Sequence, residues 1–179
     1  QVCGFLKSDP SRATPNLQFH VQPISTDILG ATKMHDFDGI TPTIANIRPT
    51  SRGEINITSN DSRDNPKIKM NYLSTQEDRD VAAKSLKIVR KIMLETNAFK
   101  KYEPEEYRPG VHITDDNELV QAGSEHTQTI FHPVGTCKMG NGEDAVVDEK
   151  LKVRGIENLR VIDASIMPNI TSGNTNAPA

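Results

Sequence analysis

The sequence predicts an α+β protein in which an antiparallel sheet is flanked by helices. Several short segments alternate apolar and polar residues and are separated by polar turns, which is typical of antiparallel strands with one solvated face. One longer segment carries apolar residues at helical spacing behind a capping sequence. The chain has 179 residues, enough for one domain to bury roughly two-thirds of its unfolded surface.

The predicted strands fall between residues 16 and 72. Residues 1–15 contain Pro10 and Pro15 and are expected to form a loop that leads into the first strand. Residues 22–40 have little periodicity, and they are expected either to line a substrate entrance or to form a solvated connector. By their period-two alternation, the strands are predicted over Asn16–Val21, Thr43–Arg48, Glu54–Thr58 and Lys67–Tyr72.

The strongest helix signal begins at Ser74. Residues 74–77 (STQE) fit a capping box, in which Ser74 and Glu77 each satisfy a free backbone amide of the first turn. A charged connector is expected over residues 97–110, followed by a short helix that Asp115 and its neighbours can cap and that continues to Ala122. The long helix is predicted to place one apolar stripe inward, through Ala82, Leu86, Val89 and Met93.

The composition excludes several classes of function. The 21 basic and 24 acidic residues give a net charge of −3, and no run of Lys or Arg indicates binding to nucleic acid or an anionic membrane. No apolar run approaches the length of a transmembrane helix, although membrane association cannot be read from this. The first residues, QVCG, do not resemble an initiator end, and we interpret the chain as a piece of a longer protein.

The two cysteines, Cys3 and Cys137, do not make a disulfide framework. Cys137 is expected to be a small buried apolar thiol. His126, His132 and Cys137 lack the paired short spacing of structural zinc sites, so no metal site is predicted.

Two long motifs occupy the chain from Phe131 to Ala179. The first is FHPVGTCKMG at residues 131–140, and the second combines VIDASIMP at 161–168 with TSGNTNAPA at 171–179. A short strand is expected between them at residues 146–148. In this order the motifs resemble the C-terminal signature of the glucose–methanol–choline (GMC) oxidoreductases, which are FAD enzymes that oxidise alcohols. The combination is most similar to bacterial alcohol and choline dehydrogenases.

The resemblance implies a division of the chain into two parts. Residues 1–130 would form part of the substrate-binding domain, whose sheet is one wall of the active-site cavity. Residues 131–179 would contribute to the active site and return to the FAD-binding domain. The dinucleotide-binding turn Gly-x-Gly-x-x-Gly is absent from the sequence, so the chain is expected to lack most of the cofactor cradle and to be inactive in isolation.

His132 is the candidate catalytic base. Oxidation of an alcohol by a flavin transfers the hydroxyl proton to a base and a hydride to flavin N5, and a histidine with an ordinary pKa of ~6.5 can accept that proton near neutral pH. Pro133 disfavours helix at His132 and places it at a strand end or turn. The resemblance gives His132 the role of base, whereas without it a core histidine would be expected. The remaining histidines, which lack a partner motif, are expected to be structural or exposed: His20, His35, His112 and His126.

The resemblance matches Asn174 to the second active-site residue, where many family members carry histidine. An amide can donate a hydrogen bond to an alkoxide but cannot serve as a base, which leaves proton transfer to His132. Asn174 can also cap a helix that starts there, whose free N–H groups would stabilise negative charge at the flavin N1–C2=O edge.

Three further residues match cofactor-binding positions of the family. Asn176 corresponds to a flavin-contacting position in the helix start. Asp163 and Ala164 correspond to the turn that meets the FAD ribose and diphosphate, after a strand predicted over residues 159–162; without the resemblance they would be an ordinary turn.

The sequence leaves several functions open. The leading hypothesis is an FAD-dependent alcohol dehydrogenase with a small alcohol as substrate and a quinone, oxygen or another electron acceptor. The alternatives are a choline dehydrogenase, an oxygen-using alcohol oxidase of the same family, or a non-catalytic module derived from such an enzyme. The cellular location is not indicated.

Overall fold

The computed structural model describes residues 2–27 and 33–179, and it confirms the α+β class: small antiparallel sheets with helices. The chain divides into two compact units. The first comprises Gln1–Pro49 and Thr75–Gln128, and the second comprises Thr50–Ser74 and Thr129–Ala179. Each unit is described by itself.

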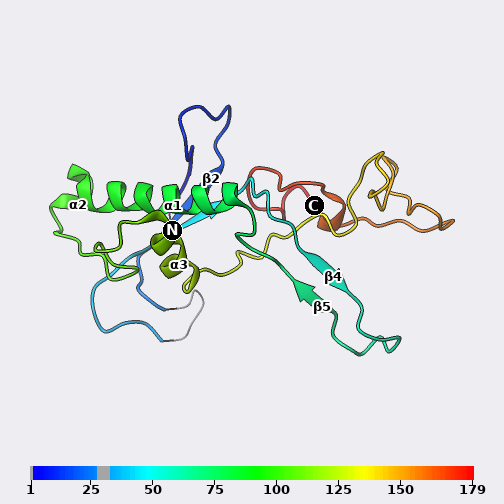
Figure 1. Ribbon diagram of the computed structural model, residues 1–179, viewed down its shortest axis with the longest axis horizontal. Coiled ribbons are helices and arrows are strands. Elements are labelled where there is room, and N and C mark those ends of the chain that lie inside the picture. The colour runs from blue at the N-terminus through cyan, green and yellow to red at the C-terminus, as the bar shows by residue number, and fades with distance from the viewer. Residues whose placement is uncertain (1, 28–32) are drawn as a thin grey trace. The chain divides into compact units, whose positions relative to one another are not determined.

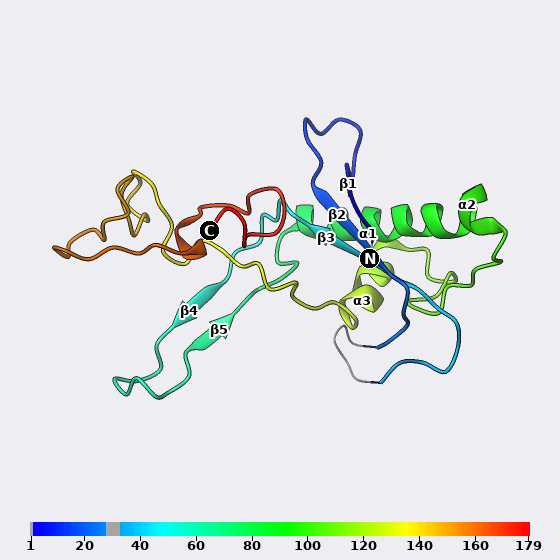
Figure 2. The ribbon, with the colours of Figure 1, turned by 180° about the vertical axis from the view of Figure 1, so that it is seen from behind.

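The first unit contains a three-stranded antiparallel sheet in the order β1 (Val2–Leu6), β2 (Leu17–Gln22), β3 (Thr41–Asn46) (Figures 1 and 2). The strands predicted at 16–21 and 43–48 are confirmed as β2 and β3 within two residues. The predicted loop over residues 1–15 is wrong at its start, because β1 pairs with β2 from Val2↔Val21 to Leu6↔Leu17. Its two prolines lie beyond β1, and the partner that stabilises this edge strand comes from elsewhere in the chain.

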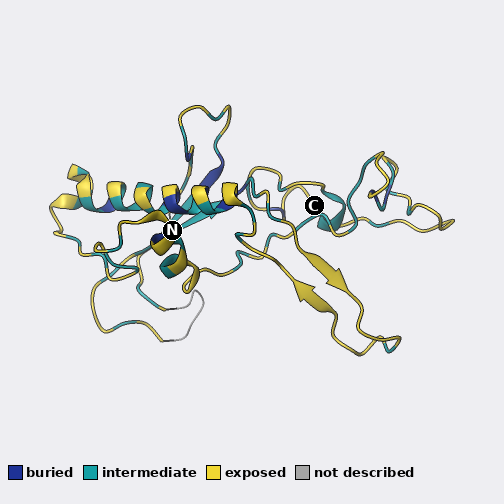
Figure 3. Cartoon of the chain, viewed as in Figure 1, coloured by how far each residue is buried: buried dark blue, intermediate teal, exposed yellow. Residues whose placement is uncertain are grey.

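The core of the first unit lies where α1 (Gln76–Arg90) packs against β3 and against α3 (Asp116–Ser124). Figure 3 shows α1 with one buried face and one exposed face, as expected of an amphipathic helix. The buried residues of α1 are Asp78, Val81, Ala83 and Ser85. Of the predicted stripe, Met93 is buried, and the other three residues are half-buried: Ala82, Leu86 and Val89. The apolar core residues here are Leu17, Ile47, Val81, Ala83, Met93 and Leu119.

The cap of α1 differs from the prediction. The N-cap is Thr75, whose backbone is extended and whose hydroxyl accepts from the Asp78 N–H at 3.3 Å. Ser74 is not the cap; its backbone N–H donates to the Ser51 hydroxyl at 3.0 Å. Glu77 pairs with Arg12 at 3.0 Å instead of completing a capping box. Adjacent Ser and Thr offer equivalent caps, and the tertiary partners of Ser74 and Glu77 select the second.

Beyond α1 the chain stays helical for longer than predicted. A π-helical segment, η1 (Lys91–Glu95), continues α1, and a short helix α2 (Asn97–Lys100) opens the region expected to be a connector. The predicted short helix is confirmed as α3, where the Asp115 carboxylate accepts from the N–H groups of Asn117 and Glu118 at 2.9 and 3.1 Å. None of the described helices is long and apolar enough to cross a membrane.

A largely buried ion pair ties the connector after α2 to α1. The Arg90 guanidinium makes two hydrogen bonds to the Glu106 carboxylate, at 2.7 and 2.9 Å, and the two side chains are only 16% and 11% exposed. Arg90 also donates to the carbonyl oxygens of Gly110 and Ile113 at 2.8 and 2.7 Å. Because four carbonyl and carboxylate acceptors surround one guanidinium, the charge is compensated although it is removed from water.

The second unit has little regular secondary structure. Its hairpin pairs β4 (Glu54–Asn56) with β5 (Lys67–Lys69), both shorter than predicted, and Figure 3 shows the hairpin exposed. The predictions of strands at residues 146–148 and 159–162 are wrong. In their place are isolated bridges from Val147 to Met139 and Val153, and from Arg160 to Lys152. Each segment pairs through single residues, which is too little to extend a ladder.

We predict that Glu106→Ala destabilises the protein by about 3–5 kcal/mol, because it leaves the Arg90 guanidinium buried without its counter-ion. The measurement is the midpoint of urea denaturation followed by circular dichroism. Arg63→Ala is the control, since it removes an ion pair to Asp61 in which Arg63 is mostly exposed, and it should leave the midpoint unchanged. Equal shifts for the two variants would contradict the assignment.

Candidate active site

Two backbone hydrogen bonds join the two sequence motifs in the second unit. The Cys137 N–H donates to the Ser165 carbonyl at 3.0 Å, and the Met139 N–H donates to the Ile166 carbonyl at 2.8 Å. Gly135 lies in the left-handed region with φ of 92°, and a Cβ there would lie 3.4 Å from the Met167 carbonyl oxygen. Segments far apart in the sequence are thereby held side by side, and the left-handed turn between His132 and Cys137 favours glycine.

His132 meets the C-terminal motif through both of its ring nitrogens. Its Nε2 lies 2.7 Å from Nδ2 of Asn174. Its Nδ1 lies 3.3 Å from Oγ1 of Thr175, and the Thr175 N–H points at the same nitrogen with the two nitrogens 3.4 Å apart. His132 is half-buried, Asn174 is exposed and Thr175 is 5% exposed. The predicted catalytic pair is thus brought into contact across 42 positions of sequence.

The segment after Asn174 forms a single hydrogen-bonded turn. The Ala179 N–H donates to the Thr175 carbonyl at 3.1 Å, the spacing of an α-helical hydrogen bond. Asn176 lies in this turn and is exposed. Its side-chain amide can donate a hydrogen bond to a neighbouring group.

Asp163 and Ala164 form a separate turn. Asp163 caps the short 3-10 helix η2 (Ala164–Ile166) by accepting from the Ser165 N–H at 2.8 Å. Hydrogen bonds from the side chain and the backbone of Ser165 lower the pKa of the Asp163 carboxyl, because they favour its charged form. Asp163 is exposed and Ala164 is half-buried. The turn therefore presents an ionised acceptor beside a small residue.

This arrangement suits proton transfer from a hydroxyl group. An imidazole nitrogen can accept the proton, and an amide N–H next to it can donate to the oxygen that loses it. The sequence-based prediction missed Thr175, which contacts the other side of the imidazole. The signal available for Thr175 was only its place beside Asn174 in the motif, and a threonine there does not by itself indicate a contact with His132.

In the part of the chain that the structure describes, no group of three His, Cys, Asp or Glu side chains is placed to hold a metal ion. Both cysteines are free. Cys137 is half-buried rather than fully buried as predicted, while its backbone N–H joins the two motifs.

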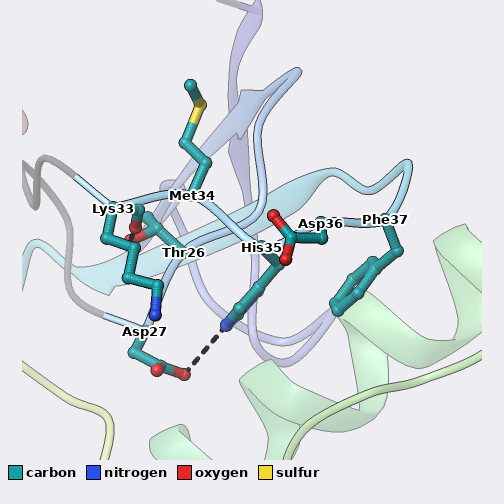
Figure 4. A pocket seen from close by; sticks show the side chains of 7 residues that line it. All are labelled: Thr26, Asp27, Lys33, Met34, His35, Asp36 and Phe37. Carbon is teal, nitrogen blue, oxygen red and sulfur yellow. Dashed lines mark hydrogen bonds and ion pairs between the residues drawn. The ribbon is translucent and has the colours of Figure 1, made fainter.

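A second polar cluster surrounds His35 in the first unit (Figure 4). His35 Nδ1 lies 2.9 Å from the Ser25 hydroxyl, and its Nε2 lies 3.2 Å from the Asp27 carboxylate. Its ring stacks on Phe37 with centroids 4.9 Å apart and meets the edge of Tyr107. These contacts fix the His35 ring from several directions, as expected for a structural histidine.

The predicted substrate-entrance role of residues 22–40 stays a prediction, and residues 28–32 lie outside the described residues. The open pocket here is lined by Thr26, Asp27, Lys33, Met34, His35, Asp36 and Phe37.

Comparisons with known proteins find the same family that the two motifs resemble. The family model described as GMC oxidoreductase matches residues 49–179. The chain is 45% identical over 176 residues to an oxygen-dependent choline dehydrogenase of Proteus mirabilis (strain HI4320), covering 97% of this chain and 31% of that protein. It is also 45% identical over 175 residues to an alcohol dehydrogenase [acceptor] of Pseudomonas putida, covering 98% of this chain and 31% of that protein.

Solved structures show the same fold. Pyridoxine 4-oxidase from Mesorbium loti matches with a TM-score of 0.85 and 27% identity, over 98% of this chain and 35% of that chain. A formate oxidase of Aspergillus oryzae matches with a TM-score of 0.81 and 27% identity, over 91% of this chain and 29% of that chain. The chain spans about a third of the length of the curated relatives it matches. It belongs to the GMC oxidoreductase family, and it corresponds to the C-terminal part of these proteins.

Proposed function

We propose that this chain is the part of an FAD-dependent oxidoreductase that carries the proton acceptor for oxidation of an alcohol CH–OH group. The observation that carries this proposal is the 2.7 Å contact between His132 Nε2 and Asn174 Nδ2. It brings a base and a hydrogen-bond donor together from the two family motifs.

In this proposal the Asn174 amide, which lies against His132 Nε2 in the structure, turns to donate a hydrogen bond to the substrate oxygen, and the freed Nε2 takes the hydroxyl proton of the substrate. That bond stabilises the negative charge that develops on the oxygen as the proton leaves. FAD, when bound, supplies the acceptor for the hydride that leaves the same carbon. An amide cannot take the proton near neutral pH, so the two residues have separate roles.

The residues proposed to hold the cofactor fit its polar groups by chemistry. Asp163 is an ionised, exposed acceptor suited to ribose hydroxyl groups, and Ala164 leaves room for close approach of the backbone. Asn176 is exposed in the turn after Asn174, and its amide can donate a hydrogen bond to a region that gains negative charge. The sequence lacks the Gly-rich turn that binds the diphosphate, and that binding is therefore assigned to other parts of the full-length protein.

The substrate is proposed to be a small alcohol, with choline as the specific alternative. Two relatives at 45% identity support these candidates by name. One is an oxygen-dependent choline dehydrogenase, and the other is an alcohol dehydrogenase that uses an unspecified acceptor. A non-catalytic module is the remaining alternative, and the intact contact between His132 and Asn174 argues against it. Flavin reduction by choline and by a simple primary alcohol, measured side by side, separates the first two.

We predict that His132→Ala in the full-length protein lowers the rate of flavin reduction by alcohol about 10²–10⁴-fold, because it removes the base. Flavin content should stay at the wild-type level. Rapid mixing under anaerobic conditions, followed by flavin absorbance, measures the rate. His126→Ala is the matched control, since His126 is exposed just beyond α3, and it should leave the rate unchanged. A rate for His132→Ala within a few-fold of wild type would place the base elsewhere.

For Asn174→Ala we expect a loss of about 2.7–4 kcal/mol of transition-state stabilisation, by analogy with removal of one oxyanion donor. Flavin content should stay at the wild-type level, because Asn174 is proposed to act on the substrate oxygen. Asn141→Ala, at another exposed asparagine of the same unit, serves as the control and should keep the wild-type rate. A rate for Asn174→Ala within a few-fold of wild type would contradict the role proposed for Asn174.

A further inference from the structure

Thr175 is a buried polar residue whose side chain lies next to Nδ1 of the His132 ring. Its Oγ1 lies 3.3 Å from His132 Nδ1, and its own backbone N–H points at the same nitrogen at 3.4 Å. The residue is 5% exposed, so water does not readily substitute for either group. One imidazole nitrogen is therefore faced by a group that can only donate and by a group that can also accept.

A neutral imidazole carries one N–H, and this gives two consistent sets of hydrogen bonds around His132. In the first set, Nδ1–H donates to the Thr175 hydroxyl, and Nε2 accepts from the Asn174 amide. In the second set, Nδ1 accepts from the Thr175 N–H, and Nε2–H donates to Asn174 with its amide turned over. Only the first set keeps Nε2 unprotonated, and its lone pair becomes available to a substrate when the Asn174 amide turns to the substrate oxygen.

The same conclusion follows for the state after proton uptake. A base that accepts at Nε2 becomes an imidazolium, in which both nitrogens are donors. Nδ1 thus carries a proton before and after the transfer, and it needs an acceptor in both states. In the part of the chain that the structure describes, the side-chain acceptor within hydrogen-bonding distance of Nδ1 is Thr175 Oγ1.

We infer that Thr175 is a positioning residue. Its hydroxyl holds His132 in the tautomer that has the proton on Nδ1 and the lone pair on Nε2. This inference rests on the proposed function of His132 as the base. Without the hydroxyl, Nδ1 faces only the Thr175 N–H, which favours the opposite tautomer. The contribution should be that of one ordinary hydrogen bond, about a tenfold change in the ratio of tautomers.

The test uses the full-length protein with ¹⁵N-labelled histidine, because ring ¹⁵N chemical shifts report which nitrogen is protonated. Wild type and Thr175→Ser should show neutral His132 mainly with the proton on Nδ1. Thr175→Val, which has nearly the same shape, should shift the ratio toward the Nε2–H tautomer by about tenfold. Thr171→Val is the matched control, at an exposed threonine of the same segment, and it should keep the wild-type ratio.

Kinetics provide the second readout. Thr175→Val should lower the limiting rate of flavin reduction about tenfold without changing the substrate concentration that gives half of that rate, and Thr175→Ser should restore the rate. A neutral His132 that carries its proton on Nε2 in wild type overturns the inference, even if Thr175→Val fails to fold. So does an unchanged tautomer ratio in Thr175→Val, or an equal shift in Thr171→Val. If His132→Ala leaves flavin reduction intact, the proposed function fails, whereas the tautomer assignment still stands on the spectra.

Discussion

The geometry around His132 depends on the backbone hydrogen bonds from Cys137 to Ser165 and from Met139 to Ile166. Neither segment has a continuous strand or long helix to hold it, so these bonds replace the ladder that a sheet would supply. They bring the segment that carries His132, the proposed base, beside the segment that leads to Asn174. Backbone bonds need no particular side chain at the donor, which explains how Cys137 can matter for position although its thiol is free.

Backbone conformations outside the common regions complete this arrangement. Phe131, directly before His132, has φ of 62°, and Ser172, two residues before Asn174, has φ of 71°. Such values are costly for residues with a side chain, and they persist where surrounding structure fixes them. Their positions beside both proposed catalytic residues are consistent with a site in which the direction of each side chain is set by the turn that precedes it.

Local patterns predicted those elements whose stability is local. Asp115 caps α3 as expected, and the alternation at residues 16–21 marks β2. The failures involve partners distant in the sequence: β1 forms because β2 pairs with it, and Thr75 becomes the cap because Ser74 bonds to Ser51. The placement of His132 and Asn174 in one active site was predicted only through motifs that resemble a family, since spacing alone cannot bring those positions together. Thr175 was missed because its contact with His132 Nδ1 exists only in the folded chain and leaves no pattern in the sequence.

The central claim is that His132 and Asn174 act as one unit on the same proton transfer. A double-mutant cycle tests it most directly, with flavin reduction by alcohol measured for His132→Ala, Asn174→Ala and the double variant. The account predicts strong non-additivity, in which the double variant is nearly as slow as His132→Ala alone, because a donor to the alkoxide has little to stabilise once the base is gone. Losses that multiply would show that the two residues act independently and would contradict the account.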